Sequence, residues 1–164
     1  MQLVKIRRAT GQDAGALTAL VQESSAYRGQ YAAVIAGYQV TPDYIERHLV
    51  FAAVNPTRQV LGFYALVVEP AELDLAFVSD EAQGLGMGRR LVEHMLDQAR
   101  RAGLAHVRVV SNPPAEQFYR RLGAEPVGMI PPSPPKVTWE RPELRFSLAH
   151  AADPASGQPV PGCW

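Results

Sequence analysis

Six residues, QGLGMG at positions 83–88, have a composition that suits the binding of a phosphate group. They lie between an apolar, strand-like run and a segment with clear helical periodicity. A helix N-terminus offers unpaired backbone N–H groups and a partial positive charge, and glycines allow a phosphate to approach because no Cβ intervenes. The segment is therefore a candidate pyrophosphate site, and a tight strand-to-helix turn without a ligand is the alternative.

The spacing of the glycines excludes two other phosphate motifs. A dinucleotide fingerprint needs G-x-G-x-x-G, and the last position is not glycine whether the count begins at Gly84 or at Gly86. A P-loop needs lysine and then serine or threonine after its last glycine. Here Gly88 is followed by Arg89 and Arg90.

A second motif follows one predicted strand later, and the two together resemble the GNAT acyltransferases. The family signature Q/R-x-x-G-x-G/A is matched over residues 83–88. The family pattern N-x-x-A-x-x-x-Y-x-x-x-G-F is matched from Asn112 to Gly123, with Ala124 in place of the final aromatic residue. The resemblance extends over about residues 3–148, including the order of the predicted elements.

The resemblance implies that acyl-coenzyme A binds in a wedge between the fourth and fifth strands. Backbone groups of two strand residues would pair with the pantetheine amides, and the glycine loop would hold the pyrophosphate. Asn112 would lie near the pantetheine arm and Tyr119 near the thioester sulfur. The expected cofactor-binding residues are Phe77, Val78, Gln83, Gly84, Leu85, Gly86, Met87, Gly88, Arg89, Asn112, Ala115 and Tyr119.

Acyl transfer to an amine makes three chemical demands. The amine must lose a proton, because an alkylammonium has a pKa near 10. The carbonyl oxygen needs a hydrogen-bond donor, for which the Val78 backbone N–H is expected, and the leaving thiolate benefits from a proton. Tyr119 is the candidate general acid. It also lies on an apolar stripe with Phe118 and Leu122, so a tyrosine that only packs in the core is the alternative.

Two carboxylates of the fourth strand, Glu72 and Asp74, are candidates for the general base. They are two residues apart, so their side chains are expected on one face unless a bulge intervenes. Some members of the family use a glutamate at the position of Glu72. A chain of water molecules, with both carboxylates simply facing solvent, is the alternative. Tyr31 is a candidate for the acceptor site, and no spacing of histidine or cysteine predicts a metal site.

The periodicities predict an α/β domain with the GNAT fold. A mixed, mostly antiparallel sheet of about six to seven strands is expected, with a V-shaped splay between the fourth and fifth and about four flanking helices. The clearest helix begins near Met87 and ends before Gly103, with apolar residues at helical spacing. Thr41 and Pro42 predict the start of a shorter helix. One domain is expected over residues 1–149, followed by a loose tail over 150–164.

Composition bounds the classes of function. The chain has 164 residues, 16 basic and 16 acidic, so general attraction to nucleic acid or anionic membranes is not indicated. No run of about 18 apolar residues predicts a membrane span, and no signal peptide is evident. Cys163 is the only cysteine, which fits a reducing cytoplasm. A homodimer is left open.

The function expected from these observations is transfer of an acetyl group from acetyl-coenzyme A to a primary amine, with Tyr119 as general acid. The acceptor is expected to be a small molecule, and its identity is not determined. A protein N-terminal or lysine acetyltransferase is the first alternative. A non-catalytic module that binds acyl-coenzyme A is the second. Valine at Gly86 or Gly88 is expected to weaken cofactor binding while the fold survives.

Overall fold

The computed structural model describes residues 3–27 and 29–148. The expected tail over residues 150–164, which includes Cys163, lies outside this range. In chain order the elements are β1 (Lys5–Arg8), η1 (Gly11–Asp13), α1 (Ala14–Gln22), η2 (Ser25–Tyr27), η3 (Gly29–Tyr31), α2 (Ala32–Ile35), α3 (Pro42–Arg47), β2 (Leu49–Val54), β3 (Val60–Val67), β4 (Glu72–Val78), η4 (Asp80–Ala82), α4 (Met87–Arg101), β5 (His106–Val110), η5 (Pro113–Ala115), α5 (Glu116–Arg121), β6 (Glu125–Ile130) and β7 (Arg141–Ser147).

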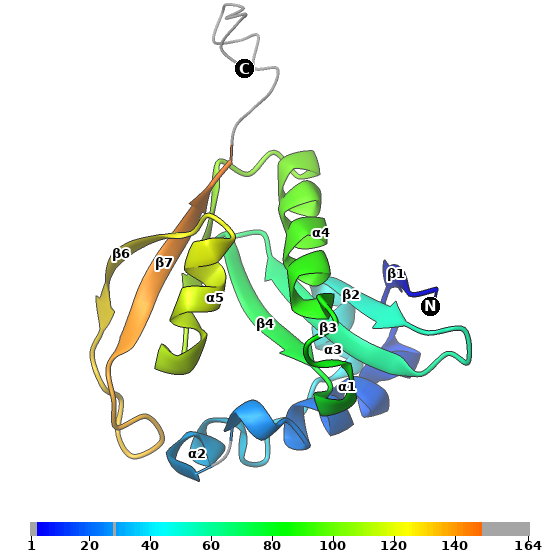
Figure 1. Cartoon of the computed structure of the whole chain (residues 1–164), viewed down its shortest axis with the longest axis horizontal. Coiled ribbons are helices and arrows are strands. Elements are labelled where there is room, and N and C mark those ends of the chain that lie inside the picture. Colours follow the sequence, from blue (N-terminus) through cyan, green and yellow to red (C-terminus); the bar gives the residue numbers. More distant parts are fainter. Residues whose placement is uncertain (1–2, 28, 149–164) are drawn as a thin grey trace, which may run out of the picture.

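The strands form one seven-stranded sheet in the order β1-β2-β3-β4-β5-β7-β6. Every neighbouring pair is antiparallel except β4 and β5, which run parallel. Only Glu72 and Arg108 are paired between those two strands. Beyond this pair the strands diverge, so the sheet has the form of a V that opens towards α1 and α2 (Figure 1). The expected mixed sheet with a splay after the fourth strand is therefore confirmed.

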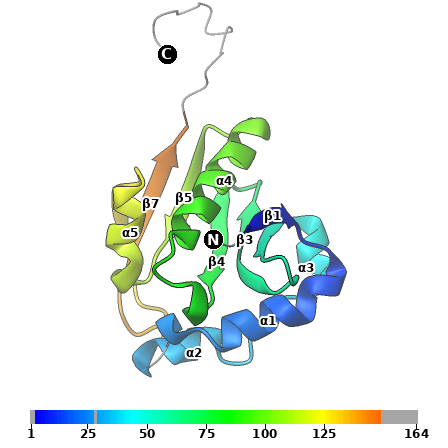
Figure 2. The same cartoon turned by 45° about the vertical axis from the view of Figure 1, so that its right-hand side comes forward.

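Helices cover both faces of the sheet, and each face has its own apolar core. On one face, α1, α2 and α3 pack against β2 and β3 through residues that include Leu17 and Ile45. On the other face, α4 and α5 pack against β3, β5 and β7, with Leu91 and Met95 fully buried. Figure 2 shows the α1–α2 segment crossing below the open end of the V. The splay thus remains accessible between two well-packed half-sheets.

Helix α4 determines the position of the glycine loop. Its apolar stripe includes Leu91, Met95 and Ala99, all buried against the sheet, so the helix cannot rotate without losing that contact. Gly103, in the left-handed conformation with φ 79°, follows its C-terminus. Two backbone bonds close that end, one of them from Leu104 N–H to the Ala99 carbonyl at 3.0 Å, as in a Schellman motif.

The segment between α1 and α3 contains only short helical elements. It consists of two 3-10 turns, η2 and η3, and the four-residue helix α2. The start of α3 agrees with its predicted cap, because the Thr41 side chain accepts a hydrogen bond from the Tyr44 N–H at 3.1 Å. The proline-rich segment between β6 and β7 forms an isolated bridge between Ser133 and Val137. Within the described residues, no helix has the length and apolar character required to cross a membrane.

Candidate active site

The edge of β4 that faces β5 is open along the second half of the strand. In an antiparallel pair, residues alternate between those bonded to the neighbouring strand and those directed away from it. Ser79 donates its N–H to the Leu61 carbonyl of β3 at 2.8 Å, so Phe77, two residues earlier, also bonds towards β3. The backbone groups of Ala76 and Val78 therefore face the gap. From the sequence, the backbone groups of Phe77 and Val78 were expected in this position, so the residue beside Val78 differs.

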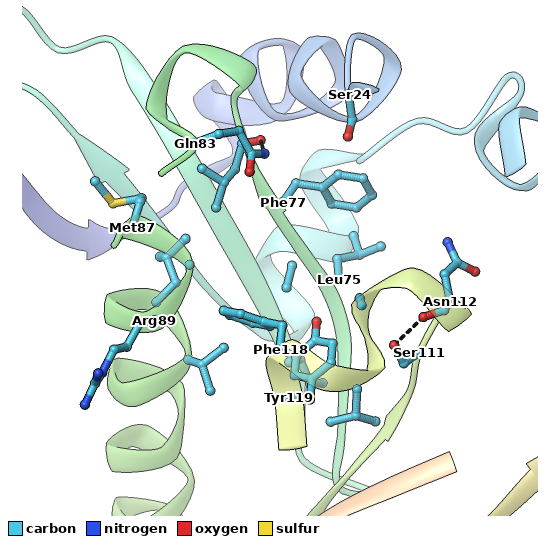
Figure 3. A pocket seen from close by; sticks show the side chains of 18 of the residues that line it. Ser24, Leu75, Phe77, Gln83, Met87, Arg89, Ser111, Asn112, Phe118 and Tyr119 are labelled. Carbon is cyan, nitrogen blue, oxygen red and sulfur yellow. Dashed lines mark hydrogen bonds between the residues drawn. The ribbon is translucent and has the colours of Figure 1, made fainter. Parts of the chain in front are cut away.

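A cavity of about 550 Å³ occupies the gap between the two halves of the sheet, a volume typical of ligand sites. Figure 3 shows Leu75 and Phe77 of β4 on one side and Phe118 and Tyr119 of α5 on the other. The glycine loop forms a further wall, and Asn112 lies near the end of β5. The cavity thus brings together the two motifs of the sequence, which are about 30 residues apart along the chain.

The glycines of the loop serve two different structural needs. Gly84 and Gly86 have φ of 80° and 77°, a left-handed conformation that side chains with a Cβ rarely adopt. Gly86 is the N-cap of α4 and turns the chain so that the first turn of the helix begins at Met87. Gly88 is needed for packing, because a Cβ there would lie 3.2 Å from Phe118 Cζ. Valine at Gly88 would therefore also displace an aromatic residue of the cavity.

The other expected loop residues divide between cavity and surface. Gln83 lines the cavity and its Nε2 donates to the Val78 carbonyl at 3.1 Å. Met87 lines it while being buried in the core. Arg89 also borders the cavity, but its side chain extends along the outside of α4 (Figure 3) and pairs with Glu93 at 2.9 Å. Leu85 is 70% exposed and is not among the cavity-lining residues.

Tyr119 places a hydroxyl group inside the cavity. Its ring packs against Phe118 and Phe146, with centroids 5.1 and 6.5 Å away, so both the packing role and the proposed chemical role are compatible with its position. The hydroxyl forms no hydrogen bond with any residue that the structure describes. Burial raises the pKa of Tyr119 above the ordinary phenol value, and the nearby Tyr27 adds to this effect. The phenol is therefore protonated at neutral pH.

The two candidate bases have different surroundings. A bulge in β4 lies between them, because Leu75 pairs with Ala65 whereas Leu73 pairs with the next residue of β3. Asp74, the additional residue of this bulge, lines the cavity and accepts a hydrogen bond from the Tyr44 hydroxyl of α3. Its neighbour Glu72 lies at the closed end of the V.

Glu72 is held in an ion-pair network and is not among the residues that line the cavity. Arg108 contacts Glu72 at 3.4 Å and Glu143 of β7 at 2.7 Å. Burial raises the pKa of the Glu72 carboxyl, Arg108 opposes this, and Asp74 adds to the increase. The two carboxylates are thus close enough to interact electrostatically, while only Asp74 borders the cavity.

The outer end of the V is covered by segments that are distant in the sequence. Tyr31 of η3 contacts the ring of Trp139 edge-to-face, with centroids 4.8 Å apart. Trp139 belongs to the connection between β6 and β7, which lies beside α2 in Figures 1 and 2. Tyr31 itself is not among the residues that line the cavity. Instead it links the two sides of the opening.

Comparison with known protein families agrees with this geometry. The model of the acetyltransferase (GNAT) domain family matches residues 19–129, which include β4, the glycine loop, α4 and the Tyr119 helix. The chain belongs to the GNAT acetyltransferase family. It is thus a GNAT-type N-acetyltransferase, as the two sequence motifs indicated. No curated protein sequence matches the chain significantly.

Solved structures of GNAT proteins share the fold at low sequence identity. The ribosomal-protein-S18-alanine N-acetyltransferase of Escherichia coli has a TM-score of 0.68 and 21% identity, over 90% of this chain and 95% of that one. A GCN5-related N-acetyltransferase of Rhodopseudomonas palustris has a TM-score of 0.71 and 18% identity, over 90% and 98%. The PaiA N-acetyltransferase of Thermoplasma acidophilum, in complex with coenzyme A, has a TM-score of 0.69 and 16% identity, over 88% and 99%.

The GNAT motifs did not identify every residue that lines the cavity. Asn112 and Ala115 were expected there and line it. Ser24, which follows the C-cap of α1, and Ser111, whose hydroxyl donates to the Asn112 carbonyl at 2.7 Å, were not expected. Both serines are buried, with 7% and 3% exposure. Tyr27 also lines the cavity, and its ring is tilted at 33° to that of Phe77 with centroids 5.3 Å apart. Its place among three tyrosines in a glycine-containing segment was the available signal.

Proposed function

We propose that this chain transfers an acetyl group from acetyl-coenzyme A to the primary amine of a small molecule by direct attack. One observation carries the proposal: a single cavity joins the open edge of β4, the N-terminus of α4 and the Tyr119 hydroxyl. The open edge offers backbone groups of Ala76 to the pantetheine amides and the Val78 N–H to the thioester carbonyl. The glycine loop offers backbone N–H groups to the pyrophosphate. Tyr119 and Asn112 border the space between them.

The chemistry uses groups that border this cavity. The nitrogen of the neutral amine forms a bond to the thioester carbonyl carbon, and the carbon–sulfur bond breaks. The Val78 N–H stabilises the negative charge on the carbonyl oxygen. Tyr119 donates its proton to the leaving sulfur and recovers one through water. The proton released by the amine passes to a carboxylate or to solvent.

Asp74 is the better placed of the two carboxylates for the role of base. It borders the cavity, whereas Glu72 is engaged by Arg108 at the closed end of the V. Asp74 also accepts the Tyr44 hydroxyl, which orients the carboxylate and leaves its second oxygen available. Glu72 contributes negative charge nearby and orients Arg108.

Substitution of each carboxylate by its amide tests this assignment. Asp74→Asn is expected to lower kcat/KM about 10-fold, less than a full general-base effect because water can carry the proton instead. Asparagine retains an oxygen that accepts the Tyr44 hydroxyl, so the fold is expected to persist. Glu72→Gln, the matched control, is expected to change kcat/KM less than about threefold. Steady-state kinetics on both variants shows which carboxylate acts as the base. A larger loss of kcat/KM for Glu72→Gln than for Asp74→Asn would assign that role to Glu72.

The covered outer end of the V supports a small acceptor. The Tyr31–Trp139 contact links η3 to the β6–β7 connection, which leaves less space beside these rings for an extended protein segment than for a small amine. A small amine can enter beside them. Acetylation of a protein N-terminus or lysine remains the competing function.

Binding of the acyl donor is the first requirement of the proposal. Acetyl-coenzyme A is expected to raise the melting temperature, since a ligand selective for the native state stabilises it by about 2.7 kcal/mol at 100 times its Kd. Thermal unfolding and titration calorimetry measure this effect, with ATP as a control that shares the adenine and phosphates but lacks pantetheine. Absence of both heat and thermal shift at millimolar acetyl-coenzyme A would contradict the proposal.

The acceptor class is tested by release of free thiol. A panel of amino acids, polyamines, aminoglycosides and lysine-containing peptides is incubated with enzyme and acetyl-coenzyme A. The proposal expects turnover with small amines and little with peptides. Turnover confined to peptides would support the competing function, and a bound cofactor without turnover on any amine would remove the proposed activity.

A further inference from the structure

Two hydrogen-bond donors are buried without an acceptor at the start of β7. Trp139 Nε1 and Arg141 Nε are inaccessible to solvent and form no hydrogen bond within the described residues. Both groups can only donate. Buried polar groups of native proteins are normally paired, so an acceptor-rich group is expected beside them when the site is filled.

Arg141 lacks a carboxylate partner among residues 3–27 and 29–148. The acidic residue nearest along β7, Glu143, already accepts from Arg108 at 2.7 Å. Arg108 also contacts Glu72, so that network holds two carboxylates for one guanidinium. The part-buried Arg141 cation stands outside it.

The unpaired donors lie beside the outer end of the candidate active site, next to residues that line its cavity, although neither Trp139 nor Arg141 lines the cavity itself. The Pro142 carbonyl accepts the Ser111 N–H at 3.0 Å, which places Arg141 next to the end of β5. Ser111 lines the cavity. The charge of Arg141 also acts on Tyr27, a cavity residue, whose pKa burial raises and Arg141 lowers. Trp139 contacts Tyr31 at the opening.

The opening therefore has negative charge on one side and unpaired hydrogen-bond donors on the other. Asp74 supplies negative charge on the β4 side, where an amine would react. Arg141 and Trp139 supply unpaired donors on the β7 side. A guanidinium matches the geometry of a carboxylate, since it can donate to both oxygens, and an indole N–H can add one further bond. Simple alkylamines and polyamines would leave these donors unpaired.

We infer that the acceptor is an amino acid or a related amino carboxylic acid, whose carboxylate binds to Arg141 and Trp139 while its amine is acetylated. The inference rests on the proposed acyl transfer and adds the substrate class. The carboxylate pairs with the guanidinium at the start of β7. The amine then lies towards Asp74 and the thioester.

A comparison of acids with their amides tests the inference. Each of the twenty amino acids is assayed beside its carboxamide, which keeps the amine and side chain but removes the negative charge. The wild-type enzyme is expected to prefer the best acid over its amide by about 10- to 100-fold in kcat/KM, the range for a hydrogen bond to a charged group. Dipeptides that begin with aspartate or glutamate, blocked as amides, show whether a side-chain carboxylate can substitute.

Variants of the β7 donors should remove this preference selectively. Arg141→Gln is expected to reduce the ratio of kcat/KM for the acid to kcat/KM for its amide to near one. The kcat/KM for the amide itself should change little. Trp139→Phe keeps the ring contact with Tyr31 but loses the N–H, and is expected to reduce the ratio by a smaller factor. Arg145→Gln is the matched control, because Arg145 is an exposed residue of the same strand; its ratio should be that of the wild type.

The results of these assays test the inferred substrate class separately from the proposed acetyltransferase activity. Equal rates with acids and amides, or an unchanged ratio in both Arg141→Gln and Trp139→Phe, would overturn it while leaving acyl transfer intact. If no amine is acetylated, the activity proposal fails, and calorimetry then decides the inference alone. In that case the coenzyme-A-loaded protein should still bind acids more tightly than amides, and equal binding overturns the inference.

Discussion

Tyr119→Phe is expected to lower kcat by about 10²- to 10⁴-fold, the usual range for loss of a general acid. Phenylalanine keeps the ring that packs against Phe118 and Phe146. Only the hydroxyl in the cavity is lost. The KM for acetyl-coenzyme A should change far less, because the proposed contact acts mainly in the transition state. Steady-state kinetics and thermal unfolding on one preparation measure both quantities.

Tyr64→Phe provides the matched control for this prediction. Tyr64 is 1% exposed, and its hydroxyl is bonded to His94 Nδ1 at 2.9 Å on the other side of β3 from α1. Loss of that hydroxyl should reduce stability by about 1 kcal/mol and leave kcat unchanged. If Tyr119→Phe behaves in the same way, with lower stability and a wild-type rate, Tyr119 only packs in the core.

The assignment of Tyr119 as general acid determines how the rate should depend on pH. A general acid must be protonated, and burial raises the pKa of Tyr119 above its ordinary value, so its acid form persists throughout the neutral and mildly alkaline range. The amine must be neutral, and its fraction increases as pH rises towards about 10. The rate should therefore rise with pH and show no alkaline decline below about pH 10. A decline near pH 8 would point to a different acid.

Gly86→Val is expected to weaken acetyl-coenzyme A binding about 100-fold, as for loss of one or two hydrogen bonds to a charged group. A β-branched residue at φ 77° is strongly disfavoured, so the backbone should move at the N-cap of α4. That movement would misdirect the N–H groups proposed to bind the pyrophosphate. Strain of this kind should also reduce stability by about 1–3 kcal/mol. Calorimetry gives the affinity and chemical denaturation gives the stability.

Gly103→Val is the control that distinguishes loss of cofactor affinity from loss of stability. Gly103 has φ 79° at the opposite end of the same helix, and a Cβ there would contact nothing within 4 Å, as at Gly86. Its substitution should reduce stability comparably and leave the cofactor affinity unchanged. Equal affinities for wild type and a folded Gly86→Val variant would exclude the loop as the pyrophosphate site.

The sequence by itself determined the elements that carry the chemistry. The apolar periodicity of α4 and the glycines at both of its ends were sufficient to predict that helix and its termini, because capping and amphipathicity are local properties. The combined spacing of QGLGMG and of Asn112 to Gly123 was sufficient for the family. The order of the elements along the chain and the splay between the fourth and fifth strands followed from the same resemblance. The place of Tyr119 in the motif predicted a position near the cofactor, and Tyr119 lines the cavity.

Only the tertiary structure decided which backbone groups and side chains of these elements face the cavity. The residues of β4 whose backbone faces the gap depend on hydrogen-bond phase with β3, which places Ala76 there and Phe77 towards β3. The bulge at Asp74 depends on the same pairing, and it separates two carboxylates that simple alternation would have treated alike.

Contacts between distant segments were likewise invisible in the sequence. Tyr31 contacts Trp139, and Arg141 lies beside the end of β5, only because β7 inserts between β5 and β6. The burial of an unpaired donor is a property of everything packed around it, and residues from several elements create it together. Local patterns specify helices, turns and motifs, whereas strand phase and burial arise from long-range packing that no local pattern contains.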